Sequence, residues 1–394
     1  MPATSFELIS QALSTGGPAA AFQSLQQTLR DRKEWHNLFD AMMLQKKFEL
    51  GLPLARPASL QDVPEPLRKQ VEAAYVAAAR EVAAGFLVDH DIFSAWMYLK
   101  VIREPGPIAE ALARLPDEMD DYELLDRYIR IALHEGVHPE KGLRWVLQGN
   151  GLCNSITSLD QVLGQLSAEQ RSDCARLLVR TLYDELTASV RRQVERRMPM
   201  LPPDLTLEKL LVGRDWLFEG GSYHVDVSHL SSVVRFARSI TAPAGEIALA
   251  RQLALYGSRL DRSLQYGGEP PFLDYYPAHL HFFDILSGRN VDAGLDYFRR
   301  QLEQEPDEQD KPLLAYVLVD LLIRAQRLEE AVDVASRYLT SLDEEISVSF
   351  DELCEQAGRL DVLQQVRQDQ GHLVGFTSAL IRNQVSKTPP PQGK

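Results

Sequence analysis

One short segment of the chain gathers side chains of the types that bind metals. Residues 223–229 read YHVDVSH, which brings His224, Asp226 and His229 close together along the sequence. If the segment is extended, His224 and Asp226 point to the same side, and if a helix begins at Asp226, then Asp226 and His229 lie one turn apart. Either arrangement lets two imidazoles and a carboxylate converge, and this donor set suits zinc, iron or manganese.

A second group of such residues follows about fifty positions later. Residues 274–281 read DYYPAHLH, where His279 and His281 are two positions apart. On a helix these two side chains point to nearly opposite sides, so at most one of them could join the first group. The surrounding segment, residues 216–283, holds 11 of the 31 aromatic residues and four of the nine histidines. This concentration favours either a binding site or a specialised packing layer.

The sequence leaves two interpretations open. One is a site for a divalent transition metal, with four expected ligands: His224, Asp226, His229 and His279. Three further side chains are expected to contact the ligands or a substrate: Tyr223, Tyr276 and His281. The alternative is that Asp226 or Ser228 caps a helix, while the histidines form hydrogen bonds inside an aromatic layer. Neither interpretation identifies a reaction, and the sequence identifies no catalytic residues.

Residues 134–138 read HEGVH, which matches the HExxH pattern of zinc proteases. In that pattern two histidines one helical turn apart bind zinc, and the glutamate acts as a general base. Here Gly136 stands between the histidines and Pro139 follows them. We expect the first helix to end at Gly136 and the next to begin at Pro139, because glycine ends helices and proline opens them. A hairpin loop is therefore the favoured interpretation.

Other classes of function find little support in the composition. No glycine-rich phosphate loop, GxSxG elbow or Cys/His nucleophile arrangement is present. The chain has 394 residues with 56 acidic and 42 basic side chains, and its formal net charge of −14 disfavours nucleic acid and anionic lipid as partners. The three cysteines are widely spaced, and neither a secretion signal nor a membrane span is recognisable. These features indicate a cytoplasmic protein.

The elements that must position these residues are helices. Apolar residues recur with helical period in nearly every segment, for example at Val71, Tyr75, Ala78 and Val82. Short breaks that contain glycine or proline separate the segments. Because short connections join antiparallel neighbours, the fold class is predicted to be all-α, with stacked helical hairpins. Only residues 223–227 alternate as a strand would.

One pair of predicted helices resembles a tetratricopeptide repeat. Leu318 and Leu322 occupy apolar positions of its first helix, and Ala331 and Ala335 occupy the small positions of its second. The turn at 326–327 has counterparts at 288–293 and 358–363, so the turns are 38 and 32 residues apart, which brackets the 34-residue period of that family. The resemblance covers about a third of the chain and implies a helical solenoid with a concave binding face.

Two stretches rich in proline and glycine, residues 52–66 and 199–221, interrupt the helical pattern. We place a boundary near residue 200, with one helical array over 1–200, a tetratricopeptide-like array over 201–385, and a disordered tail over 386–394. The predicted function is binding of a peptide or protein partner on the concave face. The alternative is a metal-dependent enzyme or metal-binding regulator that uses the site in residues 223–281.

Overall fold

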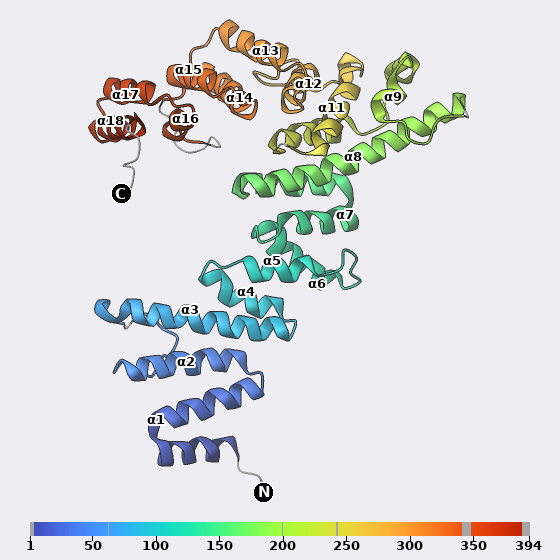
Figure 1. Cartoon of the computed structure of the whole chain (residues 1–394). Helices are drawn as coiled ribbons and strands as arrows, with labels where there is room; N and C mark the ends of the chain where they lie inside the picture. Colours follow the sequence, from blue (N-terminus) through green and yellow to red (C-terminus); the bar gives the residue numbers. More distant parts are fainter. Residues whose placement is uncertain (1–3, 62, 199, 242, 341–347, 388–394) are drawn as a thin grey trace, which may run out of the picture. The chain divides into compact units, whose positions relative to one another are not determined.

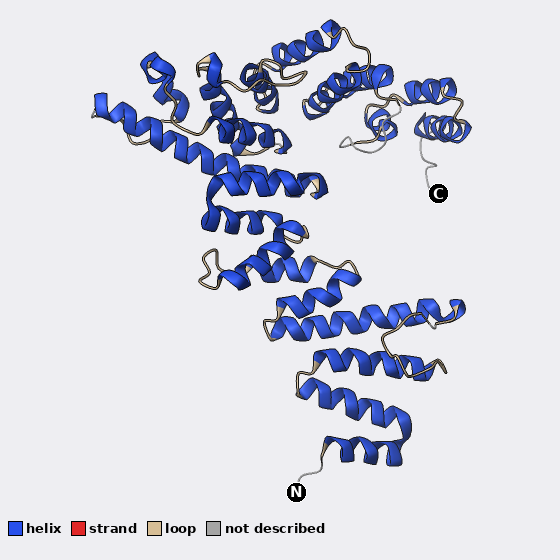
Figure 2. Cartoon of the chain, turned by 180° about the vertical axis from the view of Figure 1, so that it is seen from behind, coloured by secondary structure: helices blue, strands red, loops and turns tan. Residues whose placement is uncertain are grey.

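The computed structural model describes residues 4–61, 63–198, 200–241, 243–340 and 348–387. Within these ranges every regular element is a helix and no strand is present (Figures 1 and 2). The all-α prediction is confirmed for this part of the chain. Residues 223–226 form a loop, and a helix begins at Val227, so the alternating pattern does not form a strand. Of the described helices, none is both long and apolar enough to cross a membrane.

The chain divides into two compact units, Met1–Trp145 and Val146–Lys394. The helices of the first unit are α1 (Ser5–Asp31), α2 (Trp35–Glu49), α3 (Glu65–Val88), α4 (Ile92–Val101), α5 (Gly106–Ala113), α6 (Tyr122–Ile129) and the short π-helix η1 (Arg130–His134). Helix α7 (Pro139–Val162) begins in this unit and continues into the second, with a non-helical residue at Gly151. The predicted boundary near residue 200 lies inside the second unit, and that division of the chain stays a prediction.

Among the described residues, the second unit contains nine further elements up to residue 286: η2 (Leu163–Gln165), α8 (Ala168–Arg197), α9 (Leu207–Leu211), η3 (Asp215–Gly221), α10 (Val227–Phe236), η4 (Ala237–Ser239), α11 (Gly245–Ser258), η5 (Arg262–Leu264) and α12 (Tyr275–Leu286). Six helices follow: α13 (Val291–Gln304), α14 (Lys311–Arg324), α15 (Leu328–Tyr338), α16 (Phe350–Gln356), α17 (Leu360–Asp369) and α18 (Leu373–Lys387). The first two residues of the predicted tail, 386 and 387, belong to α18. The rest of that tail, residues 388–394, lies outside the described residues.

Neighbouring helices in the sequence pack against each other. In the first unit α1 contacts α2, α2 contacts α3, and α3 contacts α4. In the second unit α11 contacts α12, and the contacts then continue pairwise to α18. The predicted turn between α14 and α15 is present, with Gln326 at a positive φ of 59°. Ala331 and Ala335 are buried on α15, where small side chains allow the two helices to approach closely.

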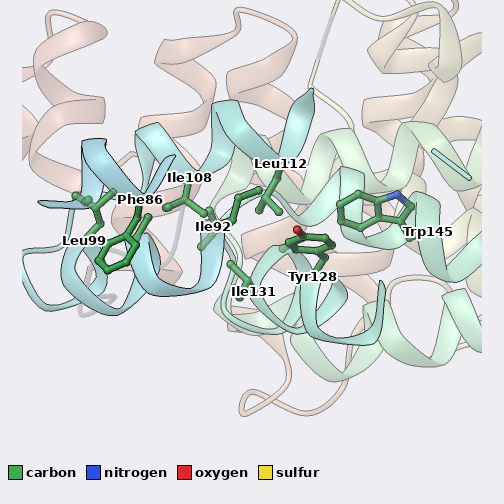
Figure 3. Packing of buried hydrophobic residues seen from close by; sticks show 12 residues of the cluster. Phe86, Ile92, Leu99, Ile108, Leu112, Tyr128, Ile131 and Trp145 are labelled. Atoms are coloured by element: carbon green, nitrogen blue, oxygen red, sulfur yellow. The ribbon is translucent and has the colours of Figure 1, made fainter. Parts of the chain in front are cut away.

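Each unit is held together by apolar side chains from these helices. In the first unit, α3 to α7 contribute one cluster, of which Figure 3 labels Phe86, Ile92, Leu99, Ile108, Leu112, Tyr128, Ile131 and Trp145. Trp145 is 1% exposed, and its indole N–H donates to the carbonyl of Pro116 at 3.0 Å. Burying one such large side chain contributes about 1.5–3 kcal/mol. The short helices α5 and α6 are therefore stabilised mainly by tertiary packing, since isolated helices of this length are marginal.

Candidate functional site

Asp226, a predicted ligand, begins helix α10. Its Oδ1 accepts hydrogen bonds from the backbone N–H of Ser228 at 2.8 Å and of His229 at 3.3 Å. The hydrogen bond from the Ser228 hydroxyl, together with the two backbone N–H groups, lowers the pKa of Asp226 despite its partial burial. The carboxylate therefore stays ionised and satisfies the free N–H groups of the first turn. The capping interpretation of Asp226 is confirmed.

His224 lies in the loop before α10 and contacts Tyr256 of α11. The Tyr256 hydroxyl is 2.8 Å from the backbone nitrogen of His224 and 2.9 Å from its Nδ1. The ring of Phe218 packs against both side chains. Burial lowers the pKa of His224, and its Nε2 is buried without a hydrogen-bond partner. The imidazole is therefore a neutral member of an aromatic contact.

His279 on α12 is completely buried between aromatic rings. The ring of Phe272 stacks on it at 4.5 Å between centroids, and Tyr275 lies at 4.4 Å. Nδ1 is 2.7 Å from the carbonyl oxygen of Tyr275, and because a carbonyl can only accept, Nδ1 carries the proton. Burial, together with the charge of Arg238, lowers the pKa of His279 to about 3. Nε2 of this neutral ring has no partner.

The remaining predicted residues contact other neighbours. Tyr276 is 0% exposed, and its hydroxyl has no hydrogen-bond partner in the part of the chain that the structure describes. Its ring lies so close to Gly257 of α11 that a Cβ there would come within 2.3 Å, which explains the glycine. His281 stacks on Tyr297 of α13 at 4.6 Å, and Tyr223 is exposed at the surface.

Of the seven predicted residues, Asp226 caps α10, and His229 lies in the first turn of that helix with its backbone N–H donating to Asp226. His224, His279 and His281 each contact a different aromatic side chain. Across the described residues, no group of three or more His, Cys, Asp or Glu side chains is arranged to hold a metal ion. The metal site stays a prediction, and elemental analysis of protein purified without an affinity metal tests it. A stoichiometric transition metal that is lost in His224→Ala and His229→Ala would support it.

The HEGVH segment forms the predicted hairpin loop. The π-helix η1 ends at His134, Gly136 has a positive φ of 71°, and α7 begins at Pro139. Glu135 accepts hydrogen bonds at 2.7 Å from Trp96 Nε1 and at 2.7 Å from Lys100 Nζ. Burial alone would raise the pKa of Glu135, but these two donors lower it overall. The glutamate therefore fixes the loop to α4.

A pocket that sequence reasoning missed lies in the second unit, beside α11. Its volume is about 340 Å³, within the range of ligand pockets. The lining comes from α9, the first half of α11 and the end of α12: Glu208, Pro243, Ala244, Ile247, Ala248, Arg251, Gln252, Leu286, Ser287 and Arg289. None of the residues predicted from the sequence lines it.

Two arginines give the pocket its charge pattern. The guanidinium of Arg251 pairs with Asp284 at 2.5 Å and with Glu208 at 3.3 Å. Although burial lowers the pKa of Arg251, the carboxylate of Asp284 raises it overall, so this cation is permanently charged and already paired. Arg289 is exposed after the Gly288 turn, and among the described residues its side chain has no hydrogen-bond or ion-pair partner.

The apolar part of the pocket comes from α11 and from the end of α12. Ile247 is buried at its base, while Ala248 and Pro243 are exposed. Arg251 is four positions after Ile247 and three after Ala248, so its side chain lies beside both on one face of α11. The pocket thus combines an aliphatic surface with the positive charge of Arg289, which has no ion-pair partner among the described residues.

No known protein family, curated protein or solved structure matches this chain. The function of the pocket therefore has to be argued from its own chemistry.

Proposed function

We propose that this chain is an interaction protein made of tetratricopeptide-like helical hairpins, and that it binds a peptide segment of a partner protein in the pocket between α9, α11 and α12. The observation that carries the proposal is the pocket itself, where an aliphatic surface adjoins the unpaired guanidinium of Arg289. Pockets with an apolar lining and a few polar groups that set orientation are typical binding sites.

The lining indicates the chemistry of the bound segment. An aliphatic side chain of moderate size fits against Ile247, Ala248 and Leu286, and an acidic side chain next to it pairs with Arg289. Arg251 is already neutralised by Glu208 and Asp284, so it holds the shape of the pocket and does not compete for the acidic group. We expect a peptide with adjacent aliphatic and acidic residues.

A random peptide display library selected on the purified chain tests this proposal. The expected result is enrichment of sequences that combine an aliphatic and an acidic residue. Selection on Arg289→Glu is expected to lose the acidic preference. Arg262→Glu is the matched control, because Arg262 is exposed in η5 beyond the far end of α11 and its side chain has no partner among the described residues.

Two results would contradict the proposal. One is the absence of any enriched sequence on the wild-type chain, and the other is an acidic preference that survives Arg289→Glu. Equal loss in the Arg262→Glu control would show that the charge of the whole surface, and not the pocket, selects the peptide.

A further inference from the structure

Helix α18 exposes an unusual number of large aliphatic side chains. Five of them are 47–79% exposed: Leu373, Val374, Leu380, Ile381 and Val385. Helix α18 lies beside α17 and contacts it (Figure 1). Ala379, on the side of α18 opposite to the five exposed residues, is completely buried. Arg382 at the side of the helix pairs with Glu355 of α16. The exposed face is therefore distinct from the surface that attaches α18 to its own unit.

The five side chains form one continuous stripe. At 100° per residue, positions 373, 374, 380, 381 and 385 fall within an arc of about 140° of the helix. The other exposed side chains up to residue 385 are Thr377, Ser378 and Gln384, and none of them is charged. Stripes of this kind mark interaction surfaces, because water solvates them poorly.

We propose that the exposed face of α18 binds α18 of a second copy of this chain. Each copy has a formal net charge of −14, so two copies repel each other wherever acidic surfaces meet. Among the described side chains of α18, which end at Val385, the exposed face brings no charge into such a contact. By comparison, the exposed Phe6 and Leu8 of α1 flank Glu7, which would place like charges together.

The order of residues along the stripe also fits a pairing of identical helices. Leu373 and Val374 lie at its beginning, Val385 at its end, and Leu380 with Ile381 between them. When the two-fold axis is perpendicular to α18, the two helices run antiparallel, and the beginning of one stripe covers the end of the other. All five aliphatic side chains of each copy are then buried at once.

The contact is small. A 15-residue helix is about 22 Å long, and it supplies fewer residues than the roughly 20–30 a side of a standard interface. We expect a dissociation constant in the micromolar range, with monomer at low concentration and dimer at high concentration. No described residue of α18 lines the pocket beside α11, so we expect self-association to be independent of peptide binding.

Sedimentation velocity from about 1 to 300 μM, a range that spans micromolar affinities, tests the proposal. The wild-type chain is expected to shift from its mass of 44.4 kDa toward twice that mass. Val385→Glu should weaken dimerisation at least tenfold. Val101→Glu is the matched control, because Val101 on α4 is 61% exposed against 66% for Val385. Circular dichroism checks that both variants are folded.

A disulfide experiment tests the antiparallel order. In a Cys153→Ser background, which removes the exposed native thiol, equal amounts of Val374→Cys and Val385→Cys chains are mixed and oxidised. The mixed disulfide is expected to exceed both symmetric ones. A wild-type chain that stays monomeric throughout the range, or a dimer weakened equally by Val101→Glu, would overturn the proposal. A dimer in which symmetric disulfides dominate would overturn the antiparallel pairing.

Discussion

Replacing Tyr276 or Tyr256 with phenylalanine is expected to change the free energy of unfolding in opposite directions. Tyr276 and Tyr256 are both 0% exposed and lie on the adjacent helices α12 and α11. Among the described residues the Tyr276 hydroxyl has no hydrogen-bond partner, whereas the Tyr256 hydroxyl is hydrogen-bonded to the backbone N–H and to Nδ1 of His224. Burial raises the pKa of both phenols, so both are neutral.

The magnitude follows from these hydrogen bonds. An unsatisfied buried polar group costs about 1–3 kcal/mol, so Tyr276→Phe should raise the free energy of unfolding by about 1 kcal/mol or more. Tyr256→Phe removes a bonded hydroxyl and leaves the backbone N–H of His224 without an acceptor. It should lower the free energy of unfolding by about 1–3 kcal/mol.

Urea unfolding followed by circular dichroism measures both changes, and midpoints can be compared if the m values agree. In thermal unfolding the shift is expected to be about 2–4 °C per kcal/mol for a unit of this size. A loss of stability in Tyr276→Phe would refute the reasoning, because it would show that the hydroxyl is engaged, as the binding role predicted from the sequence requires.

Two pH-dependent predictions follow from other buried groups. Burial lowers the pKa of His279 to about 3, whereas a histidine in the unfolded chain has a pKa of about 6.5. As the pH falls, the unfolded chain therefore takes up a proton at His279 before the folded chain does. The contribution of His279 to the free energy of unfolding is fully present above about pH 6.5 and falls by up to about 1.4 kcal/mol per pH unit down to pH 3. His279→Asn should remove this part of the dependence in urea unfolding between pH 3.5 and 7.5, and an unchanged slope would argue against a neutral buried imidazole. Burial alone would raise the pKa of Glu246, but its own backbone N–H, Arg180 and Arg176 lower the pKa overall. The ionised Glu246 therefore stabilises the folded chain above about pH 4.3, and this stabilisation is lost as the pH falls through the lowered pKa. Because both arginines are more than a third exposed and regain water, Glu246→Gln should cost only about 1–2 kcal/mol at pH 7, and a cost that persists at pH 3 would contradict this assignment.

Helix boundaries were predictable where a local signal marks them. Gly136 and Pro139 end one helix and begin another because of their own backbone preferences. The turn at Gln326 was found in the same way, from the change in apolar pattern on its two sides. The role of Asp226 was harder to predict, because a carboxylate one turn before a histidine can either cap a helix or bind a metal together with that histidine. Only the positions of the Ser228 and His229 N–H groups distinguish the two.

The pocket could not be predicted from the sequence, because its lining is assembled from distant segments. Glu208, Ile247 and Arg289 are separated by about forty residues each, and no periodic pattern connects them. Their proximity depends on how α9, α11 and the end of α12 pack. Likewise, no sequence pattern reveals that the Tyr276 hydroxyl lacks a partner, because this depends on the neighbours that surround it.

A charge-swap titration of the pocket tests the central claim most directly. A selected acidic peptide and its Lys counterpart are titrated against the wild-type chain, Arg289→Glu and the Arg262→Glu control. Reversing one charge of an exposed pair changes binding by about 1–2 kcal/mol, so Arg289→Glu should weaken the acidic peptide about tenfold and strengthen the Lys peptide. Arg262→Glu should change neither peptide. Equal affinity of the acidic peptide for the wild-type chain and Arg289→Glu would contradict peptide binding in this pocket.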